Sequence, residues 1–291
     1  MPFTHFTDIG LPAFSRELNL SFINFFLGSG GGMNQTRYYH ARLIFFFQAD
    51  GKCYFDDGTA RHCLKSGDWV LIPPLVEVRH FLDESAPHLS LHFTLTAYGG
   101  FDMLSNHPGF LTGNDPGLVR EIRREIGKND KVSLTLLFQE ICWQCLRRVR
   151  GEFPAFEPIA RLCPDSESGR LLKLLVDHAA PSLTMNKFAK FAGIPRDTLV
   201  KRLTEACGIP PGRIVDRVLV LHAVRLLTNE RRTVKETAYE LNFPTPSGFS
   251  RFFRRMTGSP PGRFQQRFQA VPPDTADLLS MLDREAKRQK G

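Results

Sequence analysis

The spacing of apolar and polar residues changes along this chain of 291 residues. Residues 36–98 hold short runs rich in aromatic and branched side chains, separated by turn pairs such as Asp57-Gly58. In the run 88–95, Leu and Phe alternate strictly with His, Ser and Thr, which is the period of a strand with two different faces. Several such strands at close spacing predict a β-sandwich or a small barrel over about residues 20–100.

From about residue 115 the apolar period lengthens to three and four residues, as on one face of a helix. We expect two helices within about 115–150, the first beginning near Pro116. The second helix either forms a dimer interface or covers the barrel with its apolar face, which consists of Leu134, Leu137, Phe138, Ile141 and Leu146. Prolines and then a polar cluster predict a linker at 161–169, and residues 170–269 are helical in pattern.

A phrase of seven residues occurs twice in this helical part, as GIPPGRI at 208–214 and GSPPGRF at 258–264. Each phrase closes a longer unit of helix, tight turn and second helix. Gly193 and Asn242 occupy equivalent turn positions, where both residues tolerate a left-handed backbone. The glycine and prolines of each phrase end the second helix. The repeat predicts two helix-turn-helix units joined by one amphipathic helix, which could hold the two second helices about 34 Å apart, one turn of DNA.

The distribution of charge separates the two parts of the chain. The net charge is +8, but residues 171–270 hold 17 Lys and Arg against 7 Asp and Glu, whereas residues 1–170 hold 17 against 19. This asymmetry predicts a polyanion-binding unit joined to a unit with another task. No apolar run approaches the roughly 20 residues of a membrane span, and the N-terminus does not read as a secretory signal. We therefore expect a cytoplasmic protein with no membrane partner.

Residues 242–260 read NFPTPSGFSRFFRRMTGSP, which resembles the closing pattern of the AraC/XylS family of bacterial transcription regulators. Similarity to the family's paired helix-turn-helix domain covers about 171–268. SGDWVLIPP at 66–74 and LSLHF at 89–93 are similar to its cupin-like effector domain. The sequence departs from the family at Asn242, which replaces the usual glycine, and at Gly248, which replaces a side chain on the expected exposed face of the recognition helix.

The resemblance implies a multidomain α+β fold. An N-terminal cupin-like β-barrel with following helices would occupy 1–160, a linker 161–169, and an all-α domain of two helix-turn-helix units joined by a linker helix 170–269. A polar tail would occupy 270–291. The resemblance also implies a homodimer that binds double-stranded operator DNA and is controlled by a small-molecule effector, with a carbohydrate as the leading candidate. If the protein is an activator, RNA polymerase is a further expected partner.

The exposed positions of the two second helices are the candidates for contact with DNA. Arginine bound to guanine through two hydrogen bonds is the commonest specific contact, so Arg251 and then Arg196 rank first for base reading. The full base-reading set is Arg196, Asp197, Thr198, Val200, Lys201, Ser247, Gly248, Ser250 and Arg251. The set expected to touch phosphates is Arg202, Lys235, Arg254, Arg255 and Arg263. For each of these residues the alternative is an ordinary solvated surface position.

Polar side chains on the expected strands are the candidates for effector binding. If they converge inside the barrel, they supply neutral and charged donors for a small polar ligand. If the polar face is open to water, as antiparallel sheets allow, they bind nothing. The candidate set is Arg37, His40, Arg42, His80, His88, Ser90 and His92.

Metal chemistry is the competing interpretation of the same histidines. Metal-binding cupins carry H-x-H followed by Glu in their first motif, and this sequence has no such string. We therefore expect no metal, no cofactor and no enzyme activity, with a cupin-type metal enzyme (isomerase or oxygenase) fused to DNA-binding helices as the alternative. The six cysteines have no framework spacing, and the pair Cys142 and Cys145 lies in a helical run, so we expect ordinary thiols there.

Overall fold

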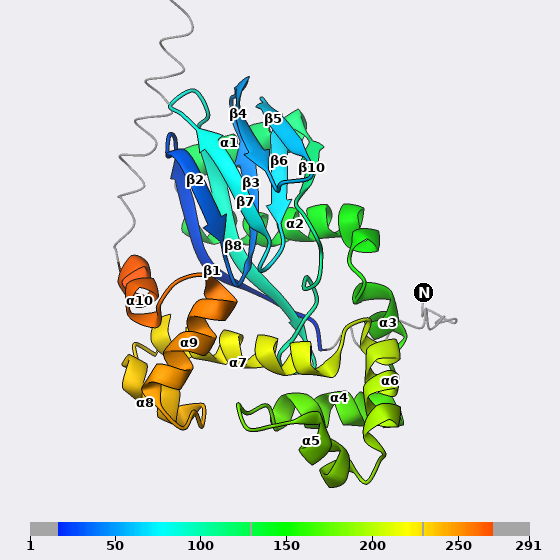
Figure 1. Cartoon of the computed structure of the whole chain (residues 1–291). Coiled ribbons are helices and arrows are strands. Elements are labelled where there is room, and N and C mark those ends of the chain that lie inside the picture. The colour runs from blue at the N-terminus through cyan, green and yellow to red at the C-terminus, as the bar shows by residue number, and fades with distance from the viewer. Residues whose placement is uncertain (1–16, 129, 229, 270–291) are drawn as a thin grey trace, which may run out of the picture.

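The computed structural model describes residues 17–128, 130–228 and 230–269, and the strands come first in the chain (Figure 1). They are β1 (Asn19–Gly28), β2 (Gly32–Arg37), β3 (Ala41–Phe46), β4 (Asp50–Asp56), β5 (Arg61–Lys65), β6 (Asp68–Ile72), β7 (Glu77–Leu82), β8 (His88–Ala97), β9 (Phe101–Asp102) and β10 (Leu111–Asn114). One sheet has the order β1-β8-β3-β6-β10, with β9 on β8, and the other has the order β2-β7-β4-β5. Every strand pair is antiparallel.

The two sheets pack face to face as a sandwich. An apolar cluster between them joins side chains such as Phe46 and Ile72 of the first sheet to Phe55 and Val78 of the second. Within the described residues no strand pairing joins the sheets into a closed barrel. The all-β part of the fold is therefore an open form of the expected barrel.

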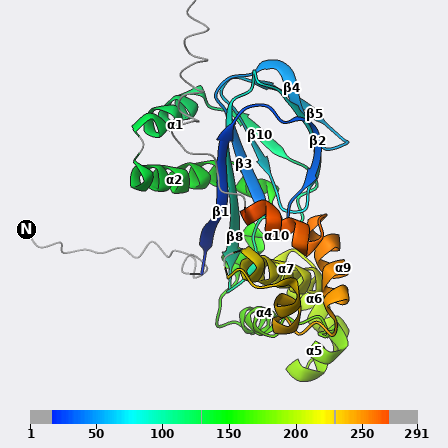
Figure 2. The same cartoon turned by 90° about the vertical axis from the view of Figure 1, so that its left-hand side faces the viewer.

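Two helices, α1 (Pro116–Lys128) and α2 (Lys131–Val149), cover the outer face of the larger sheet (Figure 2). Leu137, Phe138 and Ile141 of α2 are buried in the core that includes this sheet, and the Phe138 ring lies 5.8 Å from that of Phe25 on β1. The apolar face that could have formed a dimer interface thus covers the sheet. A different stripe of α2 is open to solvent and consists of Val132, Leu136 and Trp143.

The remaining helices form the second half of the molecule. They are η2 (Arg150–Glu152), α3 (Phe156–Arg161), α4 (Glu167–Asp177), α5 (Met185–Ala192), α6 (Arg196–Cys207), α7 (Pro211–Thr228), α8 (Val234–Glu240), α9 (Pro246–Thr257) and α10 (Pro261–Gln269). The Ser166 side chain caps α4 by accepting a hydrogen bond from the Gly169 amide. Because α4 begins at Glu167, only a short turn separates it from α3.

The helix pairs α5–α6 and α8–α9 are the two helix-turn-helix units, and α7 joins them (Figure 1). Their turns hold Gly193 and Asn242 in the left-handed region, at φ of 68° and 59°. The second helices each have 12 residues and end at left-handed Gly208 and Gly258. The expected α+β fold with a paired helix-turn-helix region is confirmed. It could be predicted because short-range signals from Gly, Pro and Thr determine where these helices begin and end.

The two units belong to different cores. The buried residues of the first unit are continuous with those under the larger sheet, α1 and α2. The second unit has its own cluster, to which Tyr39 is the one fully buried contributor from the strand half among the described residues. The helix α7 supplies both cores, Val218 and Leu219 to the first and Val224 and Leu227 to the second.

Candidate DNA-binding helices and interdomain pocket

The first recognition helix, α6, presents most of its predicted base-reading side chains to solvent. Arg196, Asp197, Thr198 and Lys201 are exposed, whereas Val200 is half-buried. Leu199, at 0% exposure, anchors the opposite face in the core. The helix thus offers one cationic and polar edge to a partner.

The second recognition helix, α9, is capped by Thr245, whose hydroxyl accepts a hydrogen bond from the Gly248 amide at 3.1 Å. A Cβ added at Gly248 would lie 3.2 Å from that hydroxyl oxygen, and Gly248 is half-buried rather than exposed as expected. The small residue therefore accommodates the cap. Ser247 and Arg251 are exposed, and the Ser250 hydroxyl donates to the Pro246 carbonyl oxygen within the helix.

Several cationic side chains near the recognition helices already have acidic neighbours. Arg196 lies 2.7 Å from Asp197, Lys201 lies 4.0 Å from Glu205, and Arg202 pairs with Glu167 on α4. These pairs are solvent-exposed for the most part, and exposed ion pairs contribute only about 0–1 kcal/mol. A DNA phosphate can therefore take the place of the carboxylate at small cost.

The residues expected to touch phosphates fall into two groups. Lys235 on α8 is exposed and, like Arg202, lies in the helical half away from the strands. Arg254 and Arg263 instead line a cavity against the sandwich. Arg255 lies 3.4 Å from Asp216 and lines a smaller neighbouring cleft. Arg254, Arg255 and Arg263 nevertheless remain exposed, so their contact with a DNA backbone stays a prediction, although each also borders a cleft against the sandwich.

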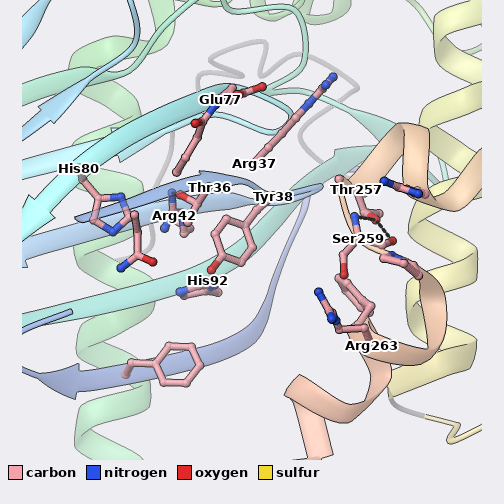
Figure 3. A pocket seen from close by; sticks show the side chains of 17 residues that line it. Thr36, Arg37, Tyr38, Arg42, Glu77, His80, His92, Thr257, Ser259 and Arg263 are labelled. Carbon is pink, nitrogen blue, oxygen red and sulfur yellow. Dashed lines mark hydrogen bonds between the residues drawn. The ribbon is translucent and has the colours of Figure 1, made fainter. Parts of the chain in front are cut away.

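The larger cavity has a volume of about 920 Å³ and lies between the sandwich and the second helix-turn-helix unit (Figure 3). One wall comes from β2, β3, β7 and β8, and includes Arg42, His80 and His92. The other wall comes from the end of α9 and the start of α10, and includes Ser259 and Arg263. Segments about two hundred residues apart in the sequence therefore share one site.

The lining is strongly cationic. It holds four guanidinium groups and a single carboxylate, which belong to Arg37, Arg42, Arg254, Arg263 and Glu77. Arg42 donates to the Thr36 hydroxyl at 2.8 Å, and its guanidinium carbon lies 4.2 Å from the centre of the Tyr38 ring. Burial lowers the pKa of Arg42 to about 10, so the group keeps its charge at neutral pH. This arrangement favours a ligand that carries negative charge.

Two buried polar atoms of this wall have no hydrogen-bond partner among the described residues, namely Arg42 Nε and His80 Nδ1. Arg42 and His80 are 6% and 8% exposed. Because an unsatisfied buried polar atom costs about 1–3 kcal/mol, these two atoms leave the polar wall of the cavity incompletely hydrogen-bonded.

Behind the pocket wall, histidines form a hydrogen-bonded chain. His40 Nε2 lies 2.7 Å from His92 Nδ1, and His92 Nε2 lies 3.1 Å from the Ser90 hydroxyl. Burial, with Arg42 nearby, holds the pKa of both imidazoles well below the usual value. Neutral imidazoles can donate from one ring nitrogen and accept at the other, as the contacts from His40 through His92 to Ser90 require.

The structure thus brings together most of the predicted effector residues. Arg37, Arg42, His80 and His92 line the cavity, and His40 and Ser90 support His92 from behind. His88 lies apart, where its Nδ1 contacts the Ala86 carbonyl oxygen. The polar face of β8 is enclosed rather than open to water, since Ser90 and His92 are 6% and 5% exposed.

Sequence reasoning missed the opposite wall of the pocket. Its members include Thr257 and, within the repeated phrase at 258–264, Ser259, Pro260 and Phe264. Among the described residues, no three side chains of His, Cys, Asp or Glu are grouped as metal ligands would be. No described helix is long and apolar enough to cross a membrane.

Residues 188–267 match the family model of a helix-turn-helix domain. The transcriptional activator RhaS of Salmonella arizonae is 29% identical over 108 residues, which is 37% of this chain and 39% of that relative. The match thus spans about two fifths of the relative's length.

Among solved structures, ToxT of Vibrio cholerae O395 is similar over 88% of this chain and 100% of its own, with a TM-score of 0.53 and 12% identity. ToxT of Vibrio cholerae strain SCE256, solved with an unsaturated fatty acid, is similar over 89% of this chain and 98% of its own, also with a TM-score of 0.53 and 12% identity. At this identity the likeness concerns the fold.

Proposed function

This chain belongs to the AraC/XylS family through its paired helix-turn-helix domain, and on that premise we propose that it is a DNA-binding transcription regulator controlled by a small effector. The observation that carries the proposal is the pair of recognition helices, α6 and α9, at the two ends of α7. A helix of 18 residues spans about 27 Å. That length suits two helices entering successive major grooves about 34 Å apart.

The two recognition helices offer different chemistry to DNA. The edge of α6 carries Arg196, Asp197 and Lys201, while that of α9 carries Ser247 and Arg251 around a glycine. We infer that the first unit reads several bases and that the second depends mainly on Arg251. Because base reading by α9 would then rest on one side chain, substitution of Arg251 is the most direct test of this inference.

Selection of binding sites from random DNA by the full chain tests DNA recognition. Arg251→Ala should weaken binding to the selected site by about tenfold to a hundredfold and relax preference at one or two positions, while weak, salt-sensitive binding remains. Arg225→Ala, which removes an exposed arginine of α7 paired with Glu230, is the matched control and should leave the preference unchanged. Equal discrimination by wild type and Arg251→Ala would refute the assignment.

We propose that the effector binds in the interdomain cavity and carries a carboxylate or similar anion. Four guanidiniums against one carboxylate favour an anion over the neutral sugar expected from the sequence. A structure of ToxT contains an unsaturated fatty acid, and another contains a naphthalenyl butenoic acid. Both of those ligands are carboxylic acids, in agreement with the charge of this cavity.

A thermal-shift screen of the full chain distinguishes these ligand classes. Fatty acids, aromatic acids and sugar acids are compared with neutral sugars, because a ligand that binds only the folded state raises Tm. We expect stabilisation by acids that Arg42→Gln abolishes. Stabilisation by neutral sugars alone, unaffected by Arg42→Gln, would contradict an anion site. It would favour the carbohydrate effector that the sequence predicts.

We further propose that the chain forms a homodimer through the exposed stripe of α2. Val132 and Leu136 are 69% and 66% exposed, and Trp143 lies two further turns along the same helix. Leu136→Glu should shift the mass measured by light scattering from dimer to monomer, whereas Gln144→Glu, a charge placed on another side of the same helix, should not. A monomeric wild-type chain at 50–100 μM, about the range for a weak dimer, would exclude this interface.

A further inference from the structure

The two copies of the repeated phrase meet the rest of the molecule in different ways. In the first copy, a Cβ added at Gly208 would lie 2.6 Å from the Pro154 carbonyl oxygen and 3.5 Å from the Pro158 ring. The next residue, Ile209, is 1% exposed. At Gly208 the first helix-turn-helix unit therefore rests directly on the segment that follows η2.

The second copy faces the cavity instead of a protein surface. A Cβ at Gly258 would meet its nearest atoms, which belong to Arg37, only at 3.8 and 3.9 Å, an ordinary contact distance. Ser259 stands where the first copy has Ile209, and its buried hydroxyl has no hydrogen-bond partner among the described residues. Arg263 and Phe264 complete this wall (Figure 3). The second copy is thus built as a polar and aromatic surface toward an open space.

The connection of α7 to the sandwich adds to this asymmetry. Arg217 of α7 donates from Nε to Asp102 on β9 at 3.0 Å and from Nη2 to the Tyr39 carbonyl oxygen at 2.7 Å. Both charged side chains are buried, at 4% and 1% exposure. Together with the continuous apolar core, this pair fixes the first unit and α7 to the strand half. The second unit has its own core, which only Tyr39 joins from the strand half among its fully buried described residues, and it faces the sandwich across the cavity.

We propose that the closing turn of the second helix-turn-helix unit, residues 258–264, is one half of the effector site, so that the ligand positions the second unit while the first stays fixed. This inference rests on the proposed effector cavity and names how it acts. An anion held by Arg42 on one wall and by Arg263 and Ser259 on the other bridges the strand half to the end of α9. Ligand binding therefore changes the placement of α9 on DNA and leaves that of α6 unchanged.

Binding of 8-anilinonaphthalene-1-sulfonate to the full chain tests this assignment. Its sulfonate and two aromatic rings match the guanidiniums and the rings of Phe26, Tyr38 and Phe264. We expect saturable binding of one dye, displaced by oleate. Arg263→Gln should weaken it about tenfold, since a hydrogen bond to a charged group contributes about that factor. Ser259→Ile, which installs the residue of the first copy, should weaken it by a similar factor.

The repeat supplies the matched control, Arg213→Gln, which alters the equivalent arginine of the first copy. Because Arg213 does not line this cavity, the variant should change dye affinity by less than twofold. A change of about twofold is the scatter of such titrations. Equal losses in Arg213→Gln and Arg263→Gln would overturn the role of the closing turn. Loss in Arg42→Gln alone would leave the cavity as the effector site but remove the turn from it. Insensitivity of all three variants would refute both proposals.

Amide hydrogen exchange of the same full-length chain provides a second readout. With dye or oleate bound, exchange should slow in α9 and α10 and stay unchanged in α5 and α6. Protection of both units to the same extent would contradict selective control of the second unit. A variant that fails to fold is recognised by rapid exchange in β3 and β8, strands buried in the larger sheet.

Discussion

Arg217 and Asp102, 115 positions apart in sequence, form a buried ion pair between the linker helix and the sandwich. Taking both charges out of water costs several kcal/mol, which a well-oriented pair only roughly recovers. Its structural contribution is therefore specificity of docking rather than net stability. The additional hydrogen bond to the Tyr39 carbonyl fixes the orientation of the guanidinium.

Removing one partner of this pair should be costly. Asp102→Asn leaves a buried guanidinium without its counter-charge and should lower the free energy of unfolding by about 3 kcal/mol. Urea denaturation of the full chain measures this. Glu157→Gln, which breaks an exposed pair with Arg161, should cost less than about 1 kcal/mol. If the two variants are equally stable, the pair is not buried in solution. The apolar pair Asp102→Leu with Arg217→Met should recover part of the loss.

The left-handed glycines offer a comparison of backbone strain with close packing. Gly193→Ala meets open space, so only the left-handed φ of 68° opposes it, at about 1 kcal/mol. Gly208→Ala adds a clash with the Pro154 carbonyl oxygen and should cost about 2–4 kcal/mol. Chemical denaturation of both variants gives the difference. A Gly208→Ala variant no less stable than Gly193→Ala would mean that the first unit does not rest on this segment.

The cap of the second recognition helix should matter for binding as well as stability. Thr245→Ala removes the acceptor of the Gly248 amide and should cost about 1 kcal/mol. Because Arg251 lies within the first two turns of α9, fraying at the cap should also weaken DNA binding. Thr245→Ser keeps the oxygen and should restore both properties. Calorimetry and fluorescence anisotropy with labelled DNA measure them, and a Ser variant as impaired as Ala would exclude the cap as the cause.

Acidification should destabilise the chain because its pocket histidines are buried in the neutral form. Burial, with contributions from Arg42 and His88, lowers the pKa of His80 to about 4 from a usual value of 6.5. The unfolded chain therefore binds more protons than the folded chain between these values. Stability is complete above about pH 6.5 and falls as the pH drops toward 4, by about 1–2 kcal/mol from this histidine at pH 5.

Urea midpoints at pH 7 and pH 5 test the expected loss. His40 and His92 act in the same direction, since burial also lowers their pKa. His80→Gln should make the midpoint less dependent on pH while leaving part of the loss from the other two. A midpoint that rises on acidification would show that these imidazoles are charged in the folded chain.

The helix-turn-helix units could be predicted from the sequence because their signals are local. Gly193, Asn242, Gly208 and Gly258 adopt the left-handed backbone expected of them, and Thr245 forms the expected cap. Such signals act over a few residues and do not depend on how the halves dock. Gly248 was harder to interpret, because only the cap distance explains why a side chain is absent there.

The pocket could be predicted only in part. Alternation along residues 88–95 identified His92 and Ser90 on one face, but periodicity alone leaves open whether that face is enclosed. The second sheet encloses it, a fact that depends on strand pairing between distant segments. The sequence places Arg254 and Arg263 on the surface of the second unit, where they are exposed, but it does not reveal that they also border a cavity. Their place in the cavity follows from docking, as does the burial of Arg217.

The strand β8 spans the distance between the pocket and the linker helix. It is hydrogen-bonded along its length to β1 and, around His92, to β3 on its other side. Beyond Ala97 the chain turns at Gly100. A Cβ added there would lie 3.5 Å from the Val176 side chain and 3.6 Å from that of Val218 on α7. A strand paired on both edges resists bending, so β8 keeps the pocket wall at His92 and the contact of Gly100 with α7 at a fixed separation. A ligand at His92 is therefore expected to leave α7 in place, and the movement that it causes falls on the opposite wall of the cavity.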